Sequence, residues 1–287
     1  MNNESKYFMG EPCDYEQAKI AVLPVPFERT TSYLQGTADG PGAIIEASYN
    51  VELYDIELAD EPYLQGIHTL PALSFPAGES IEKSIKKIEA AVGQMLEDGK
   101  FPAILGGEHT ISYPTFLAFQ QRFSNLSILH MDAHTDLRNE YLADPFSHAC
   151  VMRRIREHNK NIVSMGIRSM CQEEADYIKN EQPVIYYDHE IQKQGIPIDK
   201  LLTELTNNVF ITFDLDAVTP QEMPSVGTPE PGGLNWFQIK QLFEQVFSKK
   251  NVVGFDVVEL KPDGVNFHSD FWAAKMIYKM IGLKFHK

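Results

Sequence analysis

Acidic and histidine side chains alternate in one short segment of the sequence. Asp132, His134 and Asp136 are spaced two residues apart and directly follow an apolar run. If the chain stays extended, all three side chains point the same way, because alternate residues of a strand share a face. Two carboxylates and an imidazole aimed at one point suit a metal ion, whereas each residue alone would more often be a helix cap or a hydrogen-bonded core residue.

A second acidic pair and a further histidine follow two other apolar runs. Asp214 and Asp216 repeat the two-residue spacing, and His109 comes after the glycine turn Gly106-Gly107. Open α/β sheets place their sites at the carboxyl ends of parallel strands. We therefore expect the three groups to meet at one edge of a sheet.

Together the candidate ligands comprise four Asp and two His. Four carboxylates would balance two divalent cations, and without cations their mutual repulsion would raise their pKa values. An oxygen-rich set with imidazole and no thiolate favours Mn²⁺ or a similar ion over structural Zn²⁺. The two acidic clusters at strand ends thus predict a metal centre built from six residues: His109, Asp132, His134, Asp136, Asp214 and Asp216.

Short apolar runs that could form strands alternate with helical patterns through most of the chain. Continuous runs of this kind are typical of parallel strands buried on both faces. The predicted strands are Ile20–Val25, Pro102–Leu105, Leu126–Met131, Ile162–Ile167, Val184–Tyr187, Val209–Asp214 and Val252–Val257. The predicted helices are Ser80–Asp98, Ile111–Arg122, Asp199–Leu205, Trp236–Phe247 and Phe271–Ile281.

This alternation predicts an α/β fold with a parallel sheet covered by helices on both faces. Glycine and proline gather at Gly36–Pro41 and Gly227–Gly233, which we interpret as shaped loops between structured segments. We see no internal repeat and no linker rich in proline, glycine or serine. The expectation is a single domain over residues 1–287.

The composition limits the classes of partner. The chain of 287 residues has 40 acidic and 25 basic side chains, a net charge of −15, which disfavours nucleic acid and anionic membranes and suits a cationic ligand. Three widely spaced cysteines give no disulfide framework and favour a cytoplasmic location. No apolar run approaches the roughly 18 residues of a membrane helix, and the first residues lack the pattern of a signal peptide.

The motifs carry a resemblance to a known family. The sequence resembles the ureohydrolases of the arginase/agmatinase family, and among its branches the bacterial agmatinases. The matching motifs occur in family order from about residue 36 to the end of the chain. They are Gly36-Thr37-Ala38-Asp39-Gly40-Pro41, Gly106-Gly107-Glu108-His109, Asp132-Ala133-His134-Thr135-Asp136, Ser147-His148, Asp214-Leu215-Asp216, Gly227-Thr228-Pro229 with Gly232-Gly233, and Asp256-Val257-Val258-Glu259.

The resemblance implies an arginase-type three-layer α/β/α fold with two Mn²⁺ per chain. One ion would be held by His109, Asp132, Asp136 and Asp214, and the other by His134, Asp132, Asp214 and Asp216. Asp132 and Asp214 would then bridge the two ions, which sit roughly 3.5–4 Å apart in paired sites. The resemblance also implies a homo-oligomer, a trimer or a hexamer.

The same resemblance implies the reaction. A guanidinium is a poor electrophile, so a metal-bridging hydroxide would be the nucleophile, with Glu259 accepting the guanidinium N–H donors. His148 would pass a proton to the departing amine, and Asp216 counts among the catalytic residues as well as the ligands. Cys150, close to His148, lacks an orienting partner, and we interpret it as a packing residue.

The identity of the substrate is less closely specified. Arg138 replaces the Asn with which arginases hold an α-carboxylate, and it could pair with a carboxylate itself. Asp144 could stand near a distal ammonium, which would suit agmatine, giving putrescine and urea in polyamine biosynthesis. The same chemistry on aminopropylagmatine, 4-guanidinobutyrate, arginine or formiminoglutamate is an alternative.

Two other classes remain as alternatives. A non-catalytic relative would bind no metal, and a single-zinc deacetylase of the related fold would not need six ligands. Three positions depart from the family pattern, Thr219, Val226 and Ala149, and none of them removes a ligand.

Overall fold

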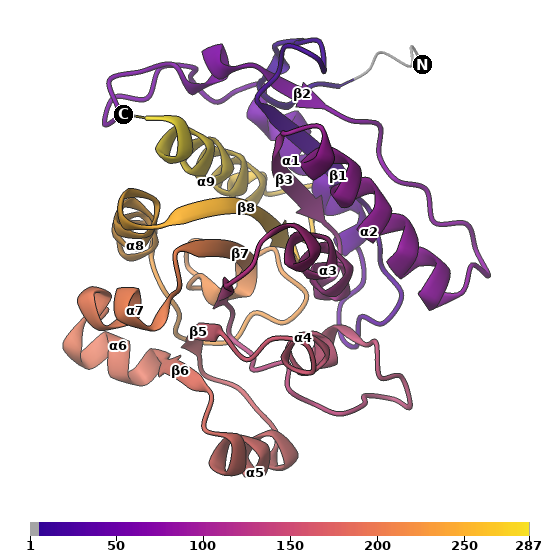
Figure 1. Cartoon of the computed structure of the whole chain (residues 1–287), viewed down its shortest axis with the longest axis vertical. Coiled ribbons are helices and arrows are strands. Elements are labelled where there is room, and N and C mark those ends of the chain that lie inside the picture. The colour runs from indigo at the N-terminus through magenta and orange to yellow at the C-terminus, as the bar shows by residue number, and fades with distance from the viewer. Residues whose placement is uncertain (1–5, 287) are drawn as a thin grey trace.

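Eight parallel strands form one central sheet in the computed structural model, which describes residues 6–286 (Figure 1). The strand order is β2-β1-β3-β8-β7-β4-β5-β6, and each of the seven pairings is parallel. The strands are β1 (Ile20–Val25), β2 (Ile67–Thr69), β3 (Phe101–Gly106), β4 (Leu126–Met131), β5 (Ile162–Ile167), β6 (Val184–Tyr187), β7 (Asn208–Asp214) and β8 (Asn251–Val258).

All seven predicted strands are confirmed, with shifts of one residue at some ends. Every residue of β1, β3, β4 and β5 is buried, which explains their uninterrupted apolar sequences. The prediction missed β2, because three residues at the edge of a sheet are too few to produce a pattern.

Nine α-helices are present within the described residues. They are α1 (Gly40–Ser48), α2 (Ile81–Glu97), α3 (Ser112–Arg122), α4 (Val151–Arg156), α5 (Gln172–Glu181), α6 (Asp188–Gln194), α7 (Ile198–Glu204), α8 (Trp236–Lys249) and α9 (His268–Phe285). The five predicted helices are confirmed as α2, α3, α7, α8 and α9. Ser80, predicted as the first residue of α2, is its cap, and its hydroxyl accepts the N–H of Lys83.

The prediction missed α1, α4, α5 and α6, and one loop prediction was wrong. Residues 37–39 form a short 3₁₀ turn and α1 begins at Gly40, inside the segment interpreted as a loop. Pro41 is favourable there, since a first-turn residue needs no N–H donor for the helix.

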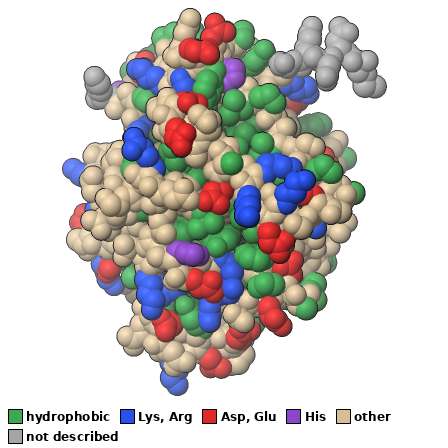
Figure 2. All heavy atoms as spheres, turned by 45° about the vertical axis from the view of Figure 1, so that its right-hand side comes forward, with side chains coloured by type: hydrophobic (Ala, Val, Ile, Leu, Met, Phe, Trp, Pro, Cys, Tyr) green, Lys and Arg blue, Asp and Glu red, His purple; other side chains and the backbone are tan. Residues whose placement is uncertain are grey.

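Helices cover both faces of the sheet and complete three layers. One face packs against apolar residues of α1, α7, α8 and α9, and the other packs against α2, α3 and α4. This confirms the three-layer α/β/α prediction. Among residues 6–286, no helix combines the length and apolar character that crossing a bilayer needs. Acidic and basic side chains are interspersed on the face in Figure 2, so the acidic excess forms no single patch there.

Candidate active site

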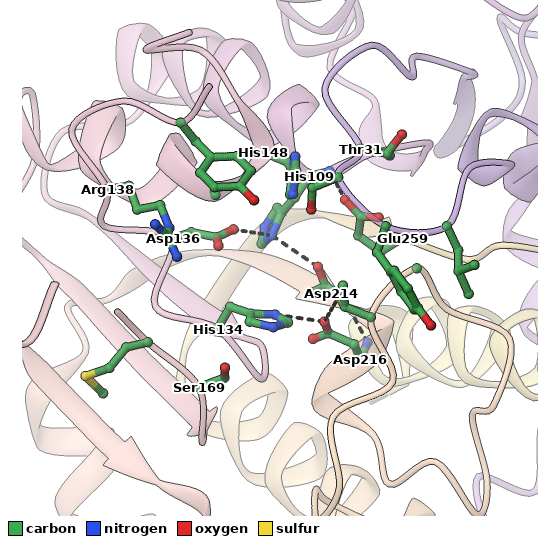
Figure 3. Close-up of a pocket in the computed structure, with 18 of the residues that line it drawn as sticks. Thr31, His109, His134, Asp136, Arg138, His148, Ser169, Asp214, Asp216 and Glu259 are labelled. Atoms are coloured by element: carbon green, nitrogen blue, oxygen red, sulfur yellow. Dashed lines mark hydrogen bonds and ion pairs between the residues drawn. The ribbon is translucent and has the colours of Figure 1, made fainter. Parts of the chain in front are cut away.

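Four neighbouring strands bring the predicted site residues to one edge of the sheet. β3, β8, β7 and β4 are consecutive in the strand order. Their carboxyl ends lead respectively to His109, to Glu259, to the pair Asp214 and Asp216, and to the segment 132–136. Figure 3 shows His109, His134, Asp136, Asp214, Asp216 and Glu259 around one cavity. The sequence-based placement of the six ligands at one sheet edge therefore agrees with the structure.

His109 lies at the centre of one group of oxygens. Its Nδ1 is 3.0 Å from Asp132 Oδ2, 3.2 Å from Asp136 Oδ2 and 3.3 Å from Asp214 Oδ2. The imidazole is buried, yet Nδ1 makes no contact with hydrogen-bond geometry. One nitrogen facing three carboxylate oxygens without a hydrogen bond is a donor set that fits a cation.

His134 forms the second group. Its Nδ1 is 2.9 Å from Asp216 Oδ2 and 3.5 Å from Asp132 Oδ1. Asp132 therefore contacts both histidines, one through each carboxylate oxygen. Asp132, His134 and Asp216 also bring their ligand atoms close enough together to hold one ion.

Two of the site residues have a left-handed backbone. Asp136 has φ 49° and Glu259 has φ 68°, a conformation that costs about 1–3 kcal/mol for residues other than glycine. Each side chain is thereby aimed into the site. At Glu259 the conformation is held because its N–H donates to the Gly107 carbonyl, while its Oε1 accepts the N–H of His109 at 2.7 Å.

The glycine turn before His109 is set by close backbone packing. A Cβ added at Gly107 would lie 2.2 Å from the Phe27 carbonyl oxygen, closer than any side chain tolerates. Gly107 N–H donates to Val25 O and Glu108 N–H donates to Phe27 O. The second glycine of the motif is therefore needed so that the turn carrying His109 can pack against the end of β1.

The buried acids have strongly shifted pKa values. Burial, and then the charge of Asp132, raises the pKa of Asp136 to about 7. Burial and the neighbouring Asp216 raise the pKa of Asp214 well above its usual range. Against the effect of burial, the neighbouring imidazoles of His109 and His130 hold the pKa of Asp132 well below its usual range. Divalent cations would relieve this crowding of negative charge.

Two residues that the sequence reasoning did not assign to the site support its ligands from behind. His130 Nε2 lies 2.9 Å from Asp132 Oδ2, and its Nδ1 lies 3.0 Å from the Ser164 hydroxyl. Thr212 Oγ1 lies 3.0 Å from Nε2 of His109. His130 stands one residue before the end of β4, and Thr212 stands two residues before the end of β7. Both strands lead to ligands, and this position in the sequence is the signal that could have identified the two residues.

Glu259 and His148 line the same cavity as the ligands, which has a volume of about 220 Å³. Glu259 is 8% exposed, and burial raises its pKa well above the usual range. Burial and the nearby histidines His109 and His134 lower the pKa of His148 to about 4. His148 is therefore neutral at pH 7.

Arg138 and Asp144 occupy different places. Arg138 lines the cavity, with its guanidinium 4.8 Å from the centre of the Tyr141 ring and its Nε 3.9 Å from Glu174 Oε2. Asp144 is not among the lining residues. Its Oδ1 accepts the N–H of Phe146, and its backbone pairs with Tyr141 in a tight reversal of the chain. The carboxylate of Asp144 is thus bonded within its own loop, and a role of this residue at the distal end of the substrate stays a prediction.

Glu174 is a further acid in the cavity wall. Its carboxylate accepts from the Thr135 hydroxyl at 2.5 Å, Leu137 N–H at 2.9 Å and Cys171 N–H at 2.8 Å. Sequence reasoning missed it, since it stands in α5, remote in sequence from every matched motif. Cys150 is fully buried, and burial raises the pKa of its thiol to about 12, in keeping with a packing role.

Comparisons with known proteins agree with this geometry. The arginase family profile matches residues 18–282. An N(1)-aminopropylagmatine ureohydrolase of Thermus thermophilus is 38% identical over 94% of this chain and 92% of its own length. An agmatinase of Bacillus anthracis is 34% identical, covering 96% and 95%.

Solved structures show the same relationship. The structure of an agmatine ureohydrolase of Thermoplasma volcanium superposes with a TM-score of 0.89 at 32% identity, covering 98% of this chain and 94% of that one. The chain belongs to the arginase family and is a ureohydrolase, a hydrolase that acts on guanidino groups.

Proposed function

We propose that this ureohydrolase releases urea from a linear guanidine with a distal amine, agmatine first among them, and leaves putrescine. The observation that carries the proposal is that five candidate ligands and the buried Glu259 carboxylate line one small cavity, while the sixth ligand, Asp132, contacts His109 and His134 in its wall. A permanently charged guanidinium matches an acidic wall of this kind.

The donor set fits two Mn²⁺ ions. His109, Asp132, Asp136 and Asp214 would hold one ion, and His134, Asp132, Asp214 and Asp216 the other. The support is the unpaired Nδ1 of His109 among three carboxylates and the absence of cysteine from the set. Bound ions of this type supply a hydroxide nucleophile at neutral pH.

Glu259 would orient the substrate. Its Oε1 is engaged by the N–H of His109, so Oε2 is left for the guanidinium. Oε2 lies on the cavity side, close to Gly227, where an added Cβ would be 3.7 Å away. A fixed carboxylate in a buried site holds the guanidinium carbon in one position, which is a large part of the advantage over water.

His148 would move the proton. As a neutral imidazole it can accept a proton during attack and deliver it to the departing amine. Because the pKa of His148 is low, a protonated His148 releases its proton readily, and the side chain returns to the neutral state after each turnover.

The distal amine of the substrate would meet the wall formed by α5. Glu174 offers a buried carboxylate there, in place of Asp144. Arg138 lies at the same end of the cavity with its Nε 3.9 Å from Glu174 Oε2, so a substrate ammonium would share this carboxylate with the guanidinium. Agmatine, with one ammonium, adds the least positive charge next to Arg138 among the amine-bearing guanidines.

Aminopropylagmatine is the second candidate. The observation that favours it is the 38% identity to a Thermus thermophilus enzyme that carries this name, against 34% for the Bacillus anthracis agmatinase. Tyr33, Leu34 and Met170 line the cavity and are partly exposed at its opening, where a longer aliphatic chain could pack.

Urea release after Mn²⁺ loading tests the proposal. Agmatine, aminopropylagmatine, arginine and 4-guanidinobutyrate are compared by kcat/KM, and formamide release from formiminoglutamate is measured separately. We expect the two amine-bearing guanidines to exceed the two carboxylates. Urea from none of the four would contradict the proposal, and bound metal per chain would separate hydrolase from the non-catalytic and single-zinc alternatives.

We also propose that residues 1–287 form one domain, because all eight strands belong to one sheet. Assembly into trimers or hexamers and a cytoplasmic location are further proposals that follow from the family. Light scattering of the purified protein tests the first of these.

A further inference from the structure

A loop after β1 reaches across the site to His148. Thr30 belongs to this loop, and its Oγ1 accepts the backbone N–H of His148 at 3.0 Å and lies 3.1 Å from Nδ1 of the same residue. Neither Thr30 nor its loop carries a matched motif. The contact joins residues 118 positions apart in the sequence.

The Thr30 hydroxyl is itself fixed by a buried carboxylate. Glu108 is fully buried, and its Oε1 accepts from the hydroxyls of Thr30 at 2.9 Å and Thr110 at 2.8 Å. Its Oε2 accepts the backbone N–H groups of Arg29 and Thr30, both at 2.7 Å. Four donors occupy the acceptor positions of one carboxylate, so the loop is held from two sides.

The contacts of Thr30 determine which nitrogen of the His148 imidazole carries the hydrogen. A threonine hydroxyl has one hydrogen, and that of Thr30 is directed at Glu108 Oε1. The remaining lone pairs of Thr30 can only accept, so Nδ1 of His148 must carry a hydrogen. In a neutral imidazole the lone pair is then on Nε2.

We propose that the Thr30 hydroxyl, oriented by Glu108, is a positioning group that holds His148 in the Nδ1–H tautomer with the Nε2 lone pair toward the cavity. This rests on the proposed function, in which His148 moves the proton. Nε2 accepts the proton that the attacking water-derived oxygen loses as its bond to the guanidinium carbon forms, and it gives this proton to the amine nitrogen as the C–N bond breaks. Nδ1–H stays bonded to Thr30 throughout, and no proton is gained or lost in the cycle.

The other groups around His148 do not replace this contact. Ser147 Oγ lies 3.4 Å from Nδ1, farther than Thr30. The Tyr141 ring meets the imidazole edge-on at 6.2 Å between centroids. Within the described residues, His109, His134 and Asp132 make no hydrogen bond with His148. Thr30 therefore gives the shortest side-chain hydrogen bond to the ring.

Three variants test the role of the hydroxyl. Thr30→Val keeps the branched shape and removes the hydroxyl, Thr30→Ser keeps the hydroxyl, and Ser147→Ala removes the more distant one. We expect Thr30→Val to lower kcat by about 10- to 100-fold, with KM changing much less. This is less than the roughly 100- to 10,000-fold of general acid–base catalysis, because the imidazole of His148 itself remains. Thr30→Ser should recover most of the loss, and Ser147→Ala should stay near wild type.

Nitrogen NMR of ¹⁵N-histidine-labelled protein reads the tautomer directly, independently of activity. The spectra are taken at pH 7.5 with Zn²⁺ as a diamagnetic substitute for Mn²⁺, and His148→Asn identifies the signals. We expect a protonated Nδ1 in the wild type and in Thr30→Ser, and a loss of this preference in Thr30→Val.

A protonated Nε2 in the wild type would overturn the proposal, as would equal kcat values for Thr30→Val and Thr30→Ser. If the wild type releases no urea from any guanidine, the proposed function fails, while the spectra still decide whether Thr30 fixes the tautomer.

Discussion

In two side chains of this site, one polar atom is hydrogen-bonded within the protein and the other faces the cavity or the candidate ligands. One oxygen of Glu259 is tied to the backbone of His109 and the other faces the cavity. One nitrogen of His109 contacts Thr212 and the other faces three carboxylates. The supporting hydrogen bond fixes the orientation of the side chain and leaves its other polar atom free to bind substrate or metal. Substitutions of these residues are therefore expected to affect either substrate binding or metal binding.

Glu259→Gln is expected to impair substrate handling while metal binding persists. The amide places a donor or a weaker acceptor opposite the guanidinium, so kcat/KM for agmatine should fall by about 100-fold or more. Metal analysis should still find the wild-type content, because Glu259 is outside the ligand set. A variant with normal activity would rule out the orienting role.

His130→Asn is expected to weaken metal binding rather than abolish it. Removal of the contact to Asp132 loosens a ligand shared by both histidines, and such changes typically cost 10- to 100-fold in metal affinity. Titration with Mn²⁺ measures the change, and His189→Asn, at an exposed site, is the matched control. Equal affinities in the two variants would contradict the supporting role.

Residue types and spacing predicted that the six candidate ligands would lie at one sheet edge, and the family resemblance added Glu259 and His148. Strand ends and motif order restrict where these side chains can lie, and the structure places them close together. Thr30, Glu108 and Glu174 could not be predicted in the same way. Their roles depend on contacts between loops that are far apart in sequence. Asp144 depends on such a contact too, since the chain reverses between Tyr141 and Asp144 and the Asp144 carboxylate accepts the N–H of Phe146.

The strands and turns at the carboxyl edge of the sheet position the site residues, because they pack closely against one another there. β8 lies between β3 and β7, and the turn after β3 packs against the end of β1. Continuous apolar runs predicted these strands correctly. Short helices such as α4 and α6 have six and seven residues, too few for a clear helical period.

Gly107→Ala tests the turn after β3. The added methyl group would clash with the Phe27 carbonyl, so the backbone carrying Glu108 and His109 must move. We expect lower metal affinity and a lower Tm, with urea release reduced in proportion to bound metal. Gly93→Ala in α2, where an added Cβ meets nothing within 4 Å, is the control and should leave Tm unchanged or higher.

We expect the stability of the protein to depend on pH through Asp256 on β8. Burial raises its pKa to about 6, against the smaller effect of His109 and the nearby hydroxyls. Because the folded-state pKa is above the unfolded value of 3.8, the contribution to stability is present below pH 4 and is lost as the pH rises through 6.

Asp256→Asn should remove this loss. Relative to wild type, its free energy of unfolding should improve by up to about 3 kcal/mol between pH 4 and pH 7. Urea denaturation of metal-free protein at several pH values measures the difference. A constant difference across this range would exclude Asp256 as the cause.

The whole molecule is also held together by charges away from the site. Lys279 in α9 is 3% exposed, with its Nζ 2.5 Å from Asp55 Oδ2 and 2.9 Å from Glu57 Oε2. These contacts tie the segment after α1 to the last helix. Neither Lys279 nor Asp55 lines the active-site cavity.

Lys279→Met should destabilise the fold by about 3–5 kcal/mol, because it leaves the buried Asp55 carboxylate without a cationic partner. The double variant Asp55→Asn, Lys279→Met should recover much of that loss. Chemical denaturation measures both, and kcat of the folded protein should stay at the wild-type value. Equal losses in the single and double variants would argue against an uncompensated charge.

The strand order has a consequence for how the protein is made. As the chain leaves the ribosome, β2-β1-β3 and β7-β4-β5-β6 can each pair, but their inner edges have no partner until β8 is synthesised. His109 is on one half-sheet and the other five ligands are on the second. A nascent chain that ends before Asn251 therefore presents two open edges to chaperones and proteases, and the halves are joined when β8 pairs with both β3 and β7.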